Sequence, residues 1–103
     1  MTQKLSKTAL KDTEFTPCID SIVSEHGLIT AAVFGAMWRF AQMRDGVCRA
    51  QLSKIAERLN VNRATIMRHI DVLVEHGYLE DLTPGLRNKP HIYVDTGKAK
   101  IKL

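Results

Sequence analysis

The sequence predicts a mostly helical fold of the α/β class, with a three-helix core and a small antiparallel hairpin. Three observations predict it. Two short series of apolar residues at helical spacing occupy residues 52–79, and Asn60-Val61-Asn62 separates them. A longer apolar segment precedes them over residues 30–43. Two short β-prone runs follow them, with a Pro-Gly loop between the runs.

Composition predicts one soluble globular domain with a preference for polyanionic partners. A chain of 103 residues buries one modest core, and 45% hydrophobic with 25% charged residues is ordinary for such a domain. The net charge is +4 and the pI is about 9.3. Most of the positive excess lies in residues 51–103, which favours nucleic acid as a partner of that half.

Cysteine and apolar patterns favour a cytoplasmic protein without metal or membrane segments. Cys18 and Cys48 are expected to be reduced thiols, with a disulfide as the less favoured alternative. No histidine has a cysteine at zinc-ligand spacing, so no metal or other cofactor is expected. The first residues lack the apolar run of a secretory signal. The most apolar segment, residues 28–43, is too short to span a membrane and contains Arg39.

The N-terminal part is expected to be a tail followed by a short helix. Residues 1–15 hold few apolar residues and are predicted to be mobile, with a basic arm along DNA as the alternative. Thr16-Pro17 is typical of a helix start, since a hydroxyl cap precedes proline at the first helical position. Ile19, Ile22 and Val23 give this helix one apolar face, and Gly27 is expected to end it.

Residues 30–43 are predicted to form the first long helix, with Thr30 as its cap. Its apolar residues cover more than half of its circumference, which indicates burial on more than one side. Phe34, Met37 and Trp38 therefore fit two interpretations: they complete the core, or they contact a second subunit in a homodimer. A turn at residues 44–46 and a very short strand over residues 47–50 are expected next.

The two apolar series over residues 52–79 predict two helices joined by a tight turn. Asn62 occupies the N-cap position of the second helix, about residues 62–76, because its side chain can accept from the free amides of the first turn. Gly77 occupies the position after the helix, where a left-handed conformation is common. Two helices joined in this way make a helix-turn-helix, whose second helix can lie in the DNA major groove.

Residues 78–82 and 91–95 are predicted to be the strands of a hairpin with a long basic loop over residues 83–90. In residues 98–103 basic and apolar residues alternate, and this segment is expected to be a basic C-terminal tail, with a further short strand as the alternative. No composition shift indicates an interdomain linker. The predicted organisation is therefore a tail over 1–15, one domain over 16–97 and a second tail over 98–103.

This pattern resembles the bacterial helix-turn-helix. Ile55-Ala56, Leu59, Val61 and Ile66 have its mutual spacing, and residues 62–68 resemble its usual "S/N-x-x-T-V/I-x-R" opening. The hairpin HGYLEDL…KPHIYV resembles the winged-helix version found in MarR-like, GntR-like and plasmid or phage regulatory proteins. The resemblance covers about residues 28–96 and implies a winged helix-turn-helix that binds duplex DNA and regulates transcription. Asn60 departs from the usual turn glycine, and Gln51 stands where a hydroxyl cap is usual.

The candidate DNA-binding residues lie on the second helix, on the helix before it and on the loop of the hairpin, the wing. Arginines on the second helix are long enough to reach guanine O6 and N7. Residues of the preceding helix and of the wing are placed for the sugar-phosphate backbone or the minor groove. The full set is Asn62, Arg63, Ala64, Thr65, Met67, Arg68, Lys54, Arg58, Arg87 and Lys89.

Catalysis is not expected, because no catalytic constellation or phosphate-binding loop is present in the sequence. His69 is interpreted as a boundary residue of the second helix, and Asp71 and Glu75 as a solvated face. Two alternatives to a transcriptional regulator stay open. One is a winged helix used as a protein-interaction module. The other is the DNA-binding part of a plasmid or phage replication or partition protein.

Overall fold

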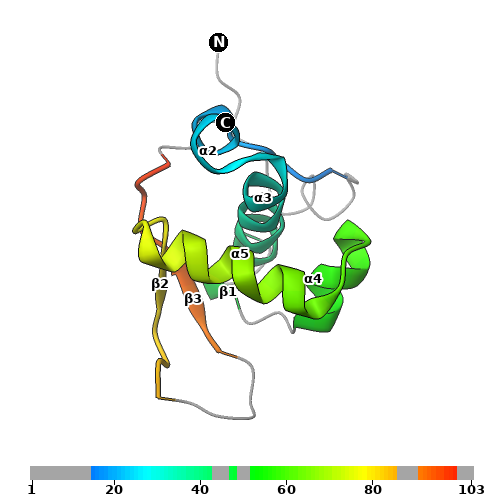
Figure 1. Ribbon diagram of the computed structural model, residues 1–103. Helices are drawn as coiled ribbons and strands as arrows, with labels where there is room; N and C mark the ends of the chain where they lie inside the picture. Colours follow the sequence, from blue (N-terminus) through cyan, green and yellow to red (C-terminus); the bar gives the residue numbers. More distant parts are fainter. Residues whose placement is uncertain (1–14, 43–46, 49–51, 86–90, 100–103) are drawn as a thin grey trace.

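One long helix, α3 (Leu28–Gln42), runs through the centre of the protein, and the other elements surround it (Figure 1). The structure is a computed structural model that describes residues 15–42, 47–48, 52–85 and 91–99. The elements around α3 are α2 (Asp20–His26), β1 (Val47–Cys48), α4 (Leu52–Leu59), α5 (Arg63–Glu75), β2 (Leu79–Asp81) and β3 (Tyr93–Asp95). The architecture is the predicted winged helix-turn-helix: α3, α4 and α5 form the three-helix core, and α2 is the extra N-terminal helix.

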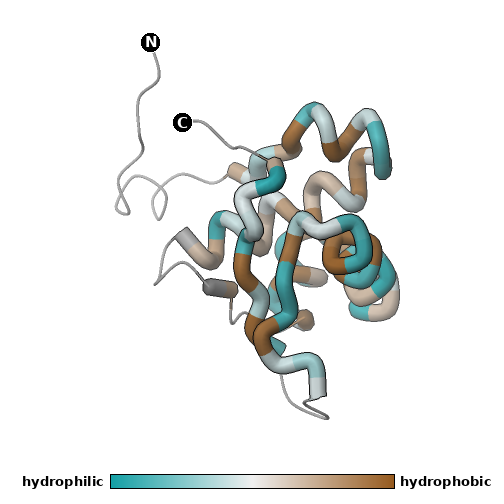
Figure 2. The backbone as a smooth tube through the Cα atoms, turned by 90° about the vertical axis from the view of Figure 1, so that its left-hand side faces the viewer, coloured by the Kyte–Doolittle hydropathy of each residue, from teal (hydrophilic) through white to brown (hydrophobic). Residues whose placement is uncertain are grey.

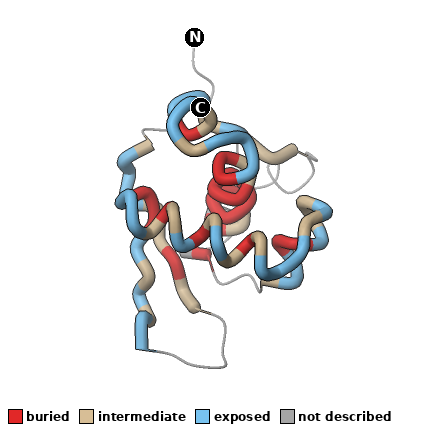
Figure 3. Tube along the Cα trace, in the orientation of Figure 1, coloured by how far each residue is buried: buried red, intermediate tan, exposed pale blue. Residues whose placement is uncertain are grey.

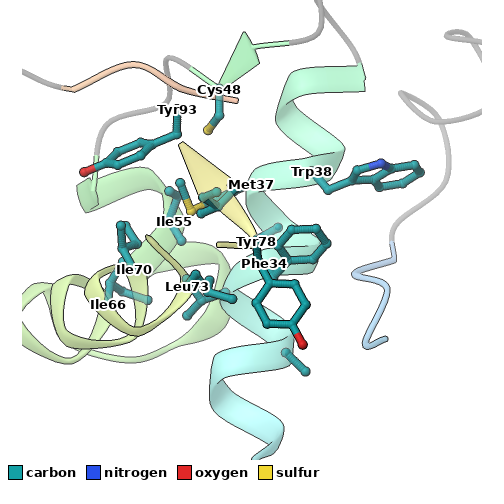
Figure 4. Close-up of a cluster of buried hydrophobic side chains, with 14 of the residues drawn as sticks. Phe34, Met37, Trp38, Cys48, Ile55, Ile66, Ile70, Leu73, Tyr78 and Tyr93 are labelled. Carbon is teal, nitrogen blue, oxygen red and sulfur yellow. The ribbon is translucent and has the colours of Figure 1, made fainter. Parts of the chain in front are cut away.

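The core is built on α3, whose side chains are buried on nearly every side (Figure 3). Phe34 is fully buried and Met37 is 1% exposed. Met37 lies toward Ile55 and Ile70 in Figure 4, whereas Trp38 lies on another side of α3. Trp38 is 6% exposed. Of the two interpretations for Phe34, Met37 and Trp38, the structure therefore supports the core, and these side chains are not available for a dimer contact.

The start of α2 differs from the prediction. The helix begins at Asp20, not at Thr16-Pro17, and Ile19 precedes it without a side-chain cap. The reason lies in the packing of the preceding segment. The Pro17 carbonyl lies so close to Gly35 of α3 that a Cβ at Gly35 would overlap it. Residues 15–19 are thus extended along α3. The end of α2 is as predicted, because Gly27 adopts φ 93° and its N–H donates to the Val23 carbonyl over 2.9 Å.

The predicted cap of the first long helix is also wrong. α3 begins at Leu28, and Thr30 lies inside its first turn. Only Gly27 separates α2 from α3, and its carbonyl accepts the first helical hydrogen bond, from Ala31 N over 3.2 Å. Thr30 is buried, and its hydroxyl instead meets His69 Nδ1 of α5 at 2.6 Å. Thr30 therefore joins the first helix of the core to the third.

A three-stranded antiparallel sheet has the order β1-β3-β2, so the predicted short strand before α4 is present and pairs with the hairpin. Val47 pairs with Val94, and Glu80 also pairs with Val94 from the other side. The hairpin strands are shorter than predicted, although Leu82 N still donates to Ile92 O over 2.8 Å. The predicted turn at 44–46 and the N-terminal tail before Phe15 lie outside the described residues.

The segment after β3 packs back onto the domain, although the sequence assigned residues from 98 onward to a tail. Lys98 Nζ donates to the His76 carbonyl over 2.6 Å and lies 4.5 Å from the centre of the Tyr78 ring. Tyr78 in turn donates its hydroxyl to Glu25 of α2 over 3.2 Å. The end of α5 is thereby held by groups from α2, from the start of the hairpin and from the chain after it.

Candidate nucleic-acid interface

Helix α5 has one face in the core and one face in solvent, as the apolar spacing predicted. Ile66, Ile70 and Leu73 are fully buried and face α3 and α4 (Figure 4). The opposite face is exposed along the whole helix (Figure 3), and its residues are Arg63, Ala64, Arg68, Asp71 and Glu75. Brown and teal alternate along the helical turns in Figure 2, as expected for such two-faced helices. Met67, predicted to lie on the exposed face, is half-buried and packs against the core.

The start of α5 is held by the predicted cap. Asn62 is extended, with φ −77° and ψ 161°, and its Oδ1 accepts from Thr65 N over 2.8 Å. The amides of Arg63 and Ala64 stand at the start of the helix, where the dipole is positive and an anion is favoured. Asn60 makes the turn before α5 with φ 56°, the conformation that asparagine tolerates better than most residues.

Two arginines stand at this start. Arg68 is exposed, and its Nη2 donates to Thr65 Oγ1 over 3.4 Å, one turn toward the N-terminus. Arg63 is exposed, and no hydrogen bond or ion pair joins it to another residue in the described parts of the chain. Ala64 lies between them and is exposed. A polyanion can therefore approach the helix closely and meet two cations.

The two cations of α4 have different surroundings. Lys54 is exposed, as a backbone contact requires. Arg58 is half-buried: its Nε donates to Thr16 Oγ1 over 3.2 Å, and its Nη2 donates to the Phe15 carbonyl over 2.7 Å. The sequence did not indicate this use of Arg58, because residues 15–16 and 58 are far apart in the chain. The guanidinium therefore fastens the extended segment before α2 to the first helix of the helix-turn-helix.

At the base of the wing, Asp81 holds the residues that flank the paired strands β2 and β3. Its Oδ1 accepts from Thr83 N over 2.8 Å, and its Oδ2 lies 2.7 Å from His91 Nδ1. Thr83 Oγ1 accepts from Ile92 N over 3.1 Å and so joins the two arms. Burial raises the pKa of Asp81, but the hydrogen bonds from His91 and Thr83 and the charge of His91 outweigh it and hold this pKa below its usual value. The predicted contacts Arg87 and Lys89 lie outside the described residues.

His69 lies at the boundary between the two faces of α5, as predicted. It is half-buried and its Nδ1 contacts the hydroxyl of Thr30. Burial, and then the charge of Arg68, lower the pKa of His69. A neutral imidazole therefore suits this position, and its Nδ1 can accept the hydrogen bond that Thr30 donates.

No helix in the described ranges is long and apolar enough to cross a bilayer. Across residues 15–42, 47–48, 52–85 and 91–99, no three His, Cys, Asp or Glu side chains are grouped so that they could hold a metal ion. Cys18, on the surface, and Cys48, in the core, are not joined by a disulfide bond.

Residues 29–79 match the model of a family described as helix-turn-helix domain. The matched segment begins one residue into α3 and ends at the first residue of β2, so it contains α3, α4 and α5. Comparison with curated proteins and with solved structures gave no match.

Proposed function

We propose that this chain is a cytoplasmic transcriptional regulator that binds duplex DNA, and the match of residues 29–79 to the helix-turn-helix domain family is the premise of this proposal. In this proposal α5 enters the major groove with its N-terminal half. The wing, residues 83–91, lies along the backbone or the minor groove.

The observation that supports this proposal best is the arrangement at the start of α5. Ile66 and Ile70 are fully buried and fix the helix to the core, and the Asn62 cap fixes its first turn. Arg63 and Arg68 are therefore presented from a rigid element, with the positive end of the helix dipole beside them. A protein that reads base edges needs such rigid presentation, because the groove admits a helix in few orientations.

The other candidate contacts enter the proposal with different roles. Lys54, exposed on α4, contacts a phosphate. Asn62 and Thr65 lie at the helix start, where the side-chain amide of Asn62 and the hydroxyl of Thr65 can donate to a phosphate. Arg87 and Lys89 supply the positive charge of the wing. Arg58 contributes to the interface by its hydrogen bonds to residues 15–16, and a phosphate contact would be made in addition to these bonds.

A salt titration of duplex binding tests the proposal. The logarithm of the binding constant should fall linearly with the logarithm of salt concentration, by about 0.9 for each phosphate contacted. Lys54→Ala should reduce this slope by about one. Lys98→Ala is the matched control, since it removes the same charge beside the other end of α5 and should leave the slope unchanged. Binding that does not depend on salt, or no binding of selected or random duplexes, would contradict the proposal.

A protein-interaction module is the second candidate, and one observation favours it. Leu28 is 63% exposed and Ile29 is 43% exposed at the start of α3. Thr30, the next residue, is buried and contacts His69 of α5, whereas these two apolar side chains face solvent. A partner protein on that surface would bind with little dependence on salt, so the same titration separates the two candidates.

Binding as a homodimer is a further proposal, because one recognition helix makes few base contacts and paired units read two half-sites. The predicted contact side chains Phe34, Met37 and Trp38 are buried within the chain, so a dimer needs another surface. Sedimentation equilibrium with a palindromic site tests this proposal. If only one chain of 11.6 kDa binds to each palindromic duplex, the dimer is excluded.

A further inference from the structure

The exposed face of α5 carries an acidic side chain in line with the arginine proposed to read a base. Ala64, Arg68 and Asp71 are all exposed and lie on one side of the helix. Arg68 and Asp71 are three residues apart, or about 4.5 Å along the helix axis. Base pairs are stacked about 3.4 Å apart, so a helix in the groove presents these two side chains to neighbouring base pairs.

The carboxylate of Asp71 is not engaged within the protein. Arg68 directs its hydrogen bond to Thr65, on the other side of it in the chain. No hydrogen bond or ion pair joins Asp71 to any other residue that the structure describes. Its acceptor oxygens are therefore available to a ligand.

Asp71 also contributes to the electrostatic surroundings of the sheet. Tyr93 of β3 is buried, and this burial raises its pKa to about 12 together with nearby negative charges. The charge of Asp81 has a larger effect than that of Asp71. The carboxylate of Asp71 is thus close enough to the hairpin to act on a side chain of β3. A duplex that receives α5 in its major groove removes water from Asp71.

A carboxylate that loses water in the groove needs a hydrogen-bond donor, because it can only accept. Guanine and thymine present the carbonyl acceptors O6 and O4 to the major groove. Adenine presents an amine with acceptors on both sides of it, its own N7 and O4 of the paired thymine, whereas the N4 amine of cytosine has an acceptor on one side only, O6 of the paired guanine. Cytosine is therefore the base from which a carboxylate accepts a hydrogen bond at least cost. Adenine adds a repulsive acceptor on each side of its amine, and guanine and thymine leave the desolvated charge without a donor.

We propose that Asp71 is a specificity-determining residue, which accepts a hydrogen bond from the N4 amine of a cytosine in the base pair next to the one that Arg68 contacts. This assignment rests on the proposed function and adds to it a base and a position. Asp71 acts mainly by exclusion, because it makes sites with guanine, thymine or adenine at that position bind more weakly.

The test compares four duplexes that differ only at that base pair. The wild-type protein first selects a site from random duplexes, and Arg68→Ala identifies the base pair that Arg68 contacts by relaxing preference there. Fluorescence anisotropy should then show that the wild type prefers cytosine at the neighbouring position by about 5- to 150-fold. Asp71→Ala should bring the four affinities within about twofold of one another. Asp71→Asn should move the preference to adenine, since an asparagine amide pairs with adenine N6 and N7.

Glu75→Gln is the matched control, because it removes a carboxylate from the same exposed face one turn farther along. It should change all four affinities by one common factor. If Asp71→Ala also changes them by a common factor, Asp71 only repels phosphates and the assignment is overturned. If the wild type binds duplex with salt dependence but binds the four duplexes equally well, only the assignment of Asp71 is overturned. A wild type that binds no duplex overturns the proposed function with it.

Discussion

The two faces of α5 differ in their surroundings, and in the proposed function one supports stability and the other supports recognition. Its inner face consists of fully buried apolar side chains, whereas its outer face carries charged side chains with few partners in the protein. A change on the inner face should therefore alter the free energy of unfolding. A change on the outer face should alter binding and leave the fold intact. Thr65, Met67 and His69 are half-buried between the two faces, so changes there should affect both quantities.

The largest effect should come from the inner face. Ile70 is fully buried in the cluster that joins α3, α4 and α5. Ile70→Ala should lower the free energy of unfolding by about 2–5 kcal/mol, through lost burial and the cavity left behind. Urea titration measures it. A loss below about 1 kcal/mol would mean that Ile70 does not sit in a well-packed core.

The next effect should come from the outer face and concern binding alone. Arg68 is exposed and contacts only Thr65 among the described residues. Arg68→Ala should weaken binding to a selected site by about 1–3 kcal/mol and relax preference at one base pair. Its urea midpoint should stay close to that of the wild type. Equal losses on selected and random duplexes would show that Arg68 holds a phosphate and reads no base.

A smaller effect should come from the cap that joins the two faces at the helix start. Asn62→Ala removes the acceptor of the Thr65 amide and should cost about 0.5–2 kcal/mol of stability. Asn62→Asp keeps an acceptor and is the control for this loss, although its negative charge should weaken DNA binding. A stability equal to that of the wild type in Asn62→Ala would show that the cap does not hold the helix start.

The smallest effect should be a dependence of stability on pH through His69. Its pKa in the folded protein lies below its ordinary value of 6.5, because of burial and then the charge of Arg68. The unfolded chain therefore takes up the proton first as pH falls. The contribution of His69 to stability is complete above about pH 6.5 and decreases below it, until the folded protein is protonated too.

His69→Gln tests this dependence, because glutamine can still bond to Thr30 but does not titrate. Urea unfolding at pH 7.5 and pH 5.5 should show a smaller loss of stability in the variant than in the wild type. The other histidines titrate in both proteins, so the difference between the two profiles isolates His69. Parallel profiles would exclude the predicted role of burial at this position.

The fold could be predicted well where the evidence was local. The apolar spacing, the Asn62 cap and Gly77, which has φ 79°, lie within one stretch of the chain and gave α4, α5 and the turn between them. The failures at Thr16-Pro17 and at Thr30 have one cause. Both segments have good local capping chemistry, but tertiary contacts with Arg58, Gly35 and His69 use the same groups.

The candidate site could be predicted only in part, for the same reason. Helical spacing was enough to place Arg63, Ala64 and Arg68 on the exposed face. It did not indicate that Arg58 donates to residues 15–16, or that Asp81 and His91 pair at the base of the wing, since such contacts join distant parts of the chain. Those contacts decide which cations are available to DNA, and spacing along one helix carries no information about them.

Chemical-shift mapping by NMR tests the central claim most directly, because it locates the duplex on a chain of 11.6 kDa without any substitution. The account predicts that the backbone amides of Arg63, Ala64 and Arg68 shift most when a selected duplex is added, with smaller shifts along the wing. His76, at the far end of α5, should change little. Shifts centred on Leu28 and Ile29, with the start of α5 unaffected, would contradict it.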